Sequence, residues 1–180
     1  MSRDTWDFDK SRGADVQSIL DWCEEKVGMG RDGITISGGE PFDQPGPFRV
    51  LLEGLREILD RAARPVDLLV YSGRKFGHLE QHHPGLLEMI DAVIAGPFMQ
   101  GRPTAKPWMG SDNQEIIPLS GLGHERYAAL PPGTGRGRMQ IKVDEGGIWM
   151  IGVPEIGEME QVQEGLAARG ITLGGSSWQA

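Results

Sequence analysis

The residues with the clearest chemical potential form a glycine-rich turn that carries a carboxylate, Ser37-Gly38-Gly39-Glu40-Pro41. The turn follows a short apolar, β-branched run at residues 33–37, which is typical of a buried strand. Ligands of α/β proteins bind at the carboxyl ends of strands, and glycine lets a ligand approach the bare backbone. The turn therefore predicts a site that offers backbone groups and one fixed carboxylate to a small polar ligand. A plain strand-to-helix turn is the simpler alternative.

The elements around this turn alternate between helical and strand patterns. Apolar residues at helical spacing predict an amphipathic helix at 15–28 and a second helix that starts near Pro45 and ends before Pro65. Strands are predicted at 33–37, 66–71 and 91–97, with a short helix near 84–90, a long loop at 97–114 and a short edge strand at 115–119. A hairpin at 141–151 and a helix at 157–169 follow.

This alternation is the rhythm of an α/β fold with a parallel sheet. Its helices lie on one side if the sheet curls into a partial barrel. A flat, doubly wound sheet fits the pattern nearly as well. Within a single domain, 1–180, we expect an irregular N-terminus at 1–13 and a C-terminal hairpin and helix at 131–180.

Composition limits the function classes. The chain has 180 residues, a net charge of -8 and one cysteine. The negative charge argues against a nucleic-acid partner, and no apolar run approaches the ~20 residues that span a bilayer. The first residues do not form a signal peptide, and one cysteine cannot make an internal disulfide. We therefore expect a cytoplasmic protein without a nucleic-acid or membrane partner.

The glycine turn resembles the S-adenosylmethionine (SAM) loop of radical SAM enzymes. The resemblance extends over roughly residues 2–120, in the order seen in the activating enzyme of anaerobic ribonucleotide reductase and its relatives. It rests on Thr5-Trp6-Asp7, 33–41, Tyr71-Ser72-Gly73, 91–97, Gly110-Ser111 and Asn113-Gln114. Such a resemblance implies a partial (β/α) barrel, here without its first strand.

The resemblance also implies ligands and roles. Gly38, Gly39 and Glu40 would hold the amino group of the methionine part of SAM. Ser72 and Asp91 would line the same mouth, since both sit at strand ends, and the loop at 101–114 would face the partner or cover the site. The family generates a 5′-deoxyadenosyl radical from SAM and installs a glycyl radical on a partner such as anaerobic ribonucleotide reductase.

One feature of the family is missing. Radical SAM enzymes hold a [4Fe–4S] cluster through C-x3-C-x2-C, because thiolates are the ligands that such a cluster requires. The single cysteine here, Cys23, falls on the apolar stripe of the first predicted helix, where a small buried hydrophobe is expected. We therefore predict that this chain has no metal ligands and cannot by itself hold the cluster.

Three interpretations follow. The chain is the body of an activating enzyme whose strand and cysteine motif are encoded in frame just upstream of Met1. Alternatively, it is a cluster-free protein that binds SAM or a partner without radical chemistry. In the third, the resemblance misleads and the chain is another α/β protein. The first leads us to expect that the strand at 33–37 lacks a neighbour on one side, a kind of edge that natural sheets avoid.

Overall fold

The computed structural model describes residues 13–99, 101–129, 140–144, 147–151 and 157–171 of the 180-residue chain. These residues fall into two compact units. The larger unit takes in the described residues up to 129 except 105–108, and the smaller takes in 105–108 and the described residues from 140 onward.

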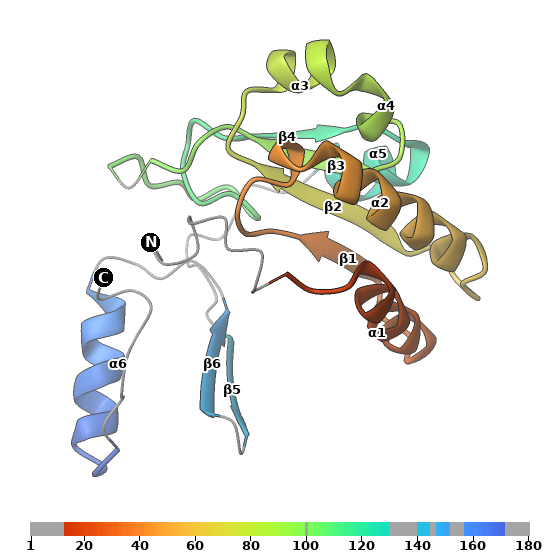
Figure 1. Ribbon diagram of the computed structural model, residues 1–180. Helices are drawn as coiled ribbons and strands as arrows, with labels where there is room; N and C mark the ends of the chain where they lie inside the picture. Colours follow the sequence, from red (N-terminus) through yellow and green to blue (C-terminus); the bar gives the residue numbers. More distant parts are fainter. Residues whose placement is uncertain (1–12, 100, 130–139, 145–146, 152–156, 172–180) are drawn as a thin grey trace. The chain divides into compact units, whose positions relative to one another are not determined.

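A four-stranded sheet of order β1-β2-β3-β4 forms the centre of the larger unit. The strands are β1 (Gly33–Ile36), β2 (Asp67–Ser72), β3 (Ala92–Ala95) and β4 (Glu115–Pro118). β1, β2 and β3 run parallel, with Ile36 beside Val70 and Ser72 beside Ala95, and β4 pairs with β3 antiparallel. Figure 1 shows these strands side by side, with helices on their faces.

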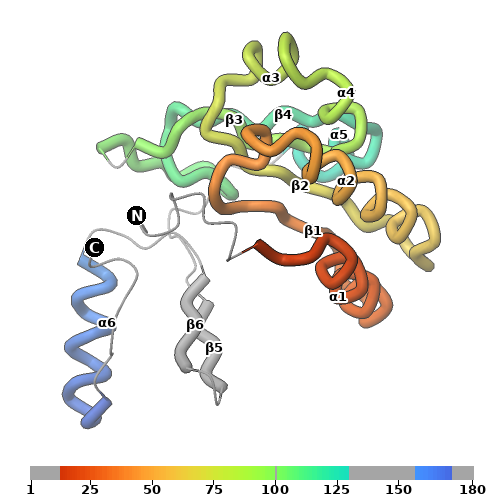
Figure 2. Tube along the Cα trace, viewed as in Figure 1, coloured from red at the N-terminus to blue at the C-terminus, as the bar shows by residue number. Residues whose placement is uncertain are grey.

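Helices fill the connections between the strands. α1 (Val16–Gly28) precedes β1, and its first turn is capped by Asp15, which accepts a hydrogen bond from the Ser18 N–H. The 3-10 turn Pro41–Asp43 and α2 (Pro45–Asp60) lie between β1 and β2; α3 (Phe76–His82) and α4 (Pro84–Leu87) follow β2, and α5 (Gly121–Tyr127) follows β4. The Cα trace in Figure 2 follows this course from α1 to α5.

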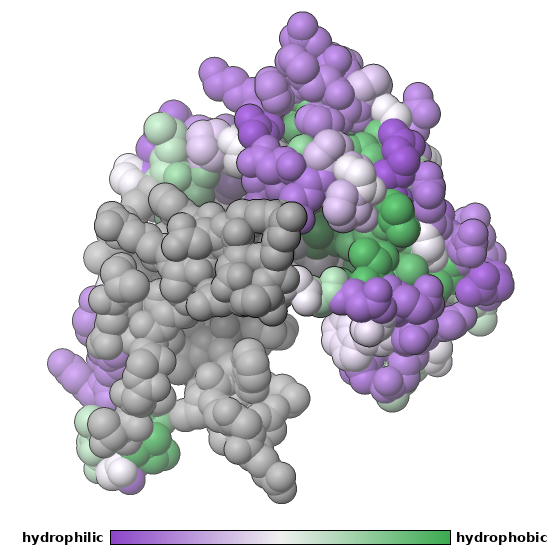
Figure 3. All heavy atoms as spheres, viewed as in Figure 1, coloured by the Kyte–Doolittle hydropathy of each residue, from purple (hydrophilic) through white to green (hydrophobic). Residues whose placement is uncertain are grey.

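The strand residues alternate between two apolar layers. Leu68, Val70 and Val93 pack with the helices α1 to α4 in the main core. Leu69 and Ile94 point the other way and pack with Tyr127 of α5. Since both faces are covered, β2 and β3 are almost fully buried, which explains why their sequences are continuously apolar. The crossover helices thus share one face of the sheet. On that side, Figure 3 shows hydrophilic residues over α3.

The α/β class is confirmed, as an open mixed sheet with helices; the partial barrel stays a prediction. β1 lies at the edge of the sheet among the described strands, with Ile34 and Ile36 half-exposed, as expected for a strand without a second neighbour. Two helices were not predicted, α3 and α5. Each has seven residues and contains glycine, so neither carries a clear helical period.

The smaller unit contains a hairpin and a helix. β5 (Gln140–Asp144) pairs antiparallel with β6 (Gly147–Ile151), and α6 (Glu158–Ala167) follows. The predicted hairpin and C-terminal helix are confirmed. Among the described residues, no helix is both long and apolar enough to cross a membrane.

Candidate functional site

Two glycines follow β1 in a backbone conformation that favours glycine. Gly38 has φ +95° and Gly39 has φ +58°, both in the left-handed region. A Cβ added at either position would meet no atom of the described residues within 4 Å. Glycine is therefore favoured here by the backbone and not by crowding, and the described residues leave room for a ligand beside both glycines.

Glu40 is the carboxylate beside this open space. Ser72 Oγ donates to it, 3.0 Å from Oε1 and 3.1 Å from Oε2, and the Gly73 N–H donates to Oε2 at 2.8 Å. The N–H of Phe42 donates to Oε1 at 3.3 Å, which caps the turn that Glu40 begins. These three hydrogen bonds fix the orientation of the carboxylate. Because all three donors are neutral, they do not neutralise its negative charge. Such a group suits a cationic ligand atom.

Parallel pairing brings these residues together. β1 and β2 are parallel neighbours, so the loops after Ile36 and after Ser72 leave the same edge of the sheet. The loop after β3 joins them, because the Gly96 N–H donates to the carbonyl oxygens of Ser72 at 3.1 Å and of Arg74 at 2.9 Å. One loop cluster therefore contains four of the five predicted site residues: Gly38, Gly39, Glu40 and Ser72.

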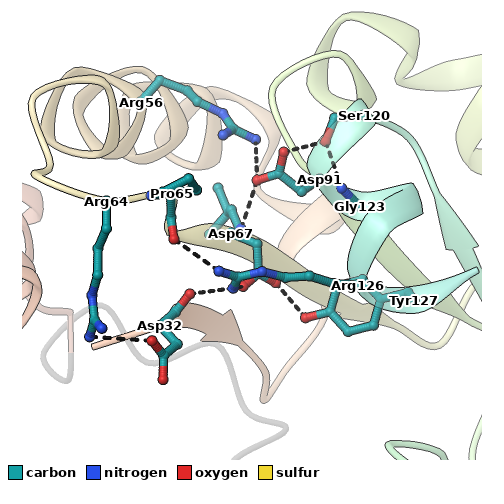
Figure 4. A network of polar contacts seen from close by, with 11 residues as sticks. Asp32, Arg56, Arg64, Pro65, Asp67, Asp91, Ser120, Gly123, Arg126 and Tyr127 are labelled. Atoms are coloured by element: carbon teal, nitrogen blue, oxygen red, sulfur yellow. Dashed lines mark hydrogen bonds and ion pairs between the residues drawn. The ribbon is translucent and has the colours of Figure 1, made fainter. Parts of the chain in front are cut away.

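The structure does not bring Asp91, the fifth residue, to this cluster. Asp91 directly precedes β3, whereas Ser72 ends β2, so the two lie at opposite edges of the parallel sheet. Its carboxylate is 4% exposed and accepts from the Leu68 N–H at 2.8 Å, from Arg56 at 3.0 Å and from Ser120 Oγ (Figure 4). These partners tie α2 and α5 to the sheet.

A second buried carboxylate, Asp67, anchors α5 at the same edge (Figure 4). The Arg126 guanidinium and the Tyr127 hydroxyl both donate to it, and Arg126 also donates to the Pro65 carbonyl at 2.9 Å. Burial, followed by the hydrogen bond to Asp67, raises the pKa of the Tyr127 hydroxyl above its ordinary value. This network was not predicted from the sequence, because its residues are far apart in the chain and two of them, Arg126 and Tyr127, belong to a helix that was not predicted.

The long predicted loop at 97–114 is organised by the residues that carried the resemblance. Gln114 Oε1 accepts from the Gly110 N–H at 2.8 Å and from the Ser111 N–H at 3.2 Å, while its Nε2 donates to the Gly96 carbonyl at 3.0 Å. Asn113 Nδ2 donates to the Pro97 carbonyl at 2.7 Å. These amides pin the loop to the carboxyl end of β3, next to the Glu40 cluster.

The chain's cysteine does not fit an iron–sulfur cluster. Cys23 lies on α1 in the main core, 5% exposed, and burial raises the pKa of its thiol. In the described part of the chain, no group of three or more His, Cys, Asp or Glu side chains could hold a metal ion. One buried thiol cannot replace the several thiolates by which such clusters are bound.

Comparison with known proteins gives matches over the first two thirds of the chain. A family model described as a 4Fe-4S single cluster domain matches residues 1–117. An anaerobic ribonucleoside-triphosphate reductase-activating protein of Enterobacteria phage T4 is 24% identical over 115 residues, 64% of this chain and 71% of the phage protein. The protein of that name from Haemophilus influenzae is 35% identical over 89 residues, 48% of this chain and 55% of its own length. No solved structure matches the chain.

Proposed function

From the premise that this chain belongs to the family of 4Fe-4S single cluster domains, we propose that it is the SAM-binding body of a reductase-activating protein. The resemblance to radical SAM activating enzymes is confirmed by the family model and by the names of the two relatives. Because the matches span 71% and 55% of those relatives, the activity and its partner, an anaerobic ribonucleotide reductase of the glycyl radical type, are part of the proposal.

The observation that carries the proposal is the fixed carboxylate of Glu40 beside the open glycines. An ammonium group placed over Gly38 and Gly39 would meet this carboxylate already oriented by Ser72 and Gly73, so the Glu40 side chain loses little conformational freedom on binding. The residues present therefore fit the amino group of SAM. When bound, SAM supplies the adenosyl group on which the family's radical chemistry depends. Asp91 is left out of the proposed site, since its carboxylate is buried among other partners.

A second function is favoured by the single buried cysteine. The family is named for a cluster that the 180 residues cannot ligate, so a protein of these residues binds SAM or a partner without radical chemistry. The two functions share the SAM loop and differ in iron content. The predicted cytoplasmic location and the absence of nucleic-acid and membrane partners stay predictions.

We also propose that the sheet is part of a partial (β/α) barrel. Three consecutive parallel strands with their crossover helices on one face support this arrangement, as does a ligand loop at the carboxyl ends. The antiparallel β4 departs from an all-parallel barrel.

Calorimetric titration of the 180-residue protein with SAM tests the proposed site. Glu40→Ala removes a charge-assisted contact and should weaken binding by about 1.5–3 kcal/mol. Gly39→Val places a branched side chain in the left-handed region and over the open space, so it should abolish binding. Glu57→Ala, on the exposed side of α2, is the control and should bind as the parent does. Unchanged affinity in both loop variants would move the site elsewhere.

A further inference from the structure

An α-amino acid ligand carries a carboxylate as well as an ammonium group. Glu40 accounts for the ammonium in the proposed function, so a cation is needed within reach of the same loop cluster. The chain places Arg74 there. Its backbone N–H donates to Ser72 Oγ at 3.1 Å, and Ser72 in turn donates to Glu40. Arg74 is therefore anchored two residues beyond the serine that orients the proposed ammonium site.

The guanidinium of Arg74 lies at the same loop cluster as Glu40. It forms an ion pair with Asp43, which is three residues after Glu40 in the turn that Glu40 begins. The hydrogen bond to Asp43 and the charge of Asp43 raise the pKa of Arg74. The charge of Glu40 raises it further, by a smaller amount, so Arg74 and Glu40 interact electrostatically. The loop cluster thus presents the fixed carboxylate of Glu40 after β1 and the guanidinium of Arg74 after β2.

We propose that Arg74 binds the α-carboxylate of the amino-acid part of the ligand while Glu40 binds its ammonium group. This inference rests on the proposed function and names the recognition element within it. The arginine fork binds a carboxylate through two parallel hydrogen bonds, a geometry that lysine cannot reproduce. The ligand carboxylate replaces Asp43 as the partner of the fork.

Exposure makes this exchange inexpensive. The Arg74 and Asp43 side chains are 39% and 55% exposed, and a surface ion pair of this kind contributes little free energy. By contrast, Arg56 and Arg126 are committed to the buried carboxylates Asp91 and Asp67 at the opposite edge of the sheet. Arg74 is therefore a cation that can change partners beside Glu40.

The test compares two ligands that differ in one group, SAM and decarboxylated SAM, which keeps the ammonium and lacks the α-carboxylate. Both are titrated into the 180-residue protein by calorimetry. Arg74→Gln should weaken SAM binding about tenfold or more and leave the affinity for decarboxylated SAM equal or higher. Arg74→Lys should retain part of the affinity for SAM. Arg61→Gln, which breaks the exposed ion pair with Glu24, is the matched control and should change neither affinity.

The outcomes separate this inference from the function on which it rests. Equal losses for both ligands, or no loss for either in a variant that melts at the parent temperature, would overturn the role of Arg74 and leave the SAM site standing. If the parent protein binds neither ligand, the proposed function fails and the inference fails with it. If Arg74→Gln unfolds the protein, the ligand difference in Arg74→Lys decides: a smaller loss for decarboxylated SAM than for SAM supports the role, and equal losses overturn it.

Discussion

Glu40 and Asp91 show how surroundings decide the role of a carboxylate. Glu40 is half-exposed at the carboxyl edge of the sheet, and three neutral donors hold it. Asp91 is buried at the amino edge, where Arg56 neutralises it and the Leu68 N–H and Ser120 hydroxyl occupy its oxygens. The first arrangement leaves charge available to a ligand. The second uses it within the fold.

Replacement of Asp91 should therefore affect stability and not ligand binding. Asp91→Ala leaves the buried Leu68 N–H and Arg56 without their partner, which should cost about 2–4 kcal/mol of unfolding free energy. Urea denaturation measures the loss, and SAM titration should give the parent affinity. The control Asp32→Ala, which removes an exposed ion pair with Arg64, should cost about 1 kcal/mol or less. Weaker SAM binding by a folded Asp91→Ala protein would contradict this prediction and show that Asp91 contributes to the SAM site.

Gly123 marks a close approach of two backbones. A Cβ at this position would lie 1.9 Å from the Asp91 carbonyl oxygen, and a backbone atom cannot move aside as a flexible side chain can. Gly123→Ala should cost about 1–3 kcal/mol or more through overpacking, measured as a lower urea midpoint. Gly121→Ala is the matched control in the same helix, because a Cβ there meets no atom within 4 Å in the part of the chain that the structure describes. Equal stability of the two variants would contradict the close packing of α5 on β3.

At the scale of elements, α5 depends on tertiary contacts. A seven-residue helix with two glycines does not persist by propensity. Ser120 caps its first turn and contacts Asp91, while Arg126 and Tyr127 bind Asp67 at its end. The helix is thus held to the amino edge at both ends, and Tyr127 completes the apolar layer over Leu69 and Ile94. This arrangement covers the face of the sheet opposite the crossover helices.

The Tyr127 contact predicts a pH dependence. Since its pKa in the folded protein is raised, the unfolded chain loses this proton near its ordinary pKa of about 10 while the folded protein retains it. The unfolding free energy should therefore fall as pH rises above about 10. Tyr127→Phe should lower stability by about 1 kcal/mol at neutral pH and should reduce the fall at high pH. Urea unfolding at a series of pH values measures both; an unchanged fall in the variant would assign it to another group.

For the whole molecule, iron content is the decisive property. The 180 residues supply one thiol, and it is buried in the main core. We predict that anaerobic reconstitution leaves no stable [4Fe–4S] cluster on this chain, because a single thiolate cannot hold one. Iron and sulfide assays should give equally low values for the parent and for Cys23→Ala. About four irons per chain, with the matching absorption band, would show that other ligands replace the thiolates.

The sequence by itself determined the family, the order of the main elements and the position of the glycine loop. These follow from local signals: an apolar run ended by two glycines, helical spacing in α1 and α2, and turn residues at fixed offsets. The family model confirmed the resemblance to radical SAM activating enzymes. The strands and the larger helices lie within a few residues of the predicted ranges.

Only the tertiary structure decided which polar residues meet. Ser72 and Asp91 both stand at strand ends, but one ends its strand and the other begins it, and parallel pairing sends the two to opposite edges. The link from Tyr127 to Asp67 spans 60 positions in the chain and requires α5 to close over the sheet. Strand direction and long-range packing set these contacts, and neither leaves a local trace in the sequence. For that reason Glu40 and Ser72 could be placed at one site from the sequence, while the hydrogen bonds that Ser72 and Gly73 donate to Glu40 were fixed by the fold.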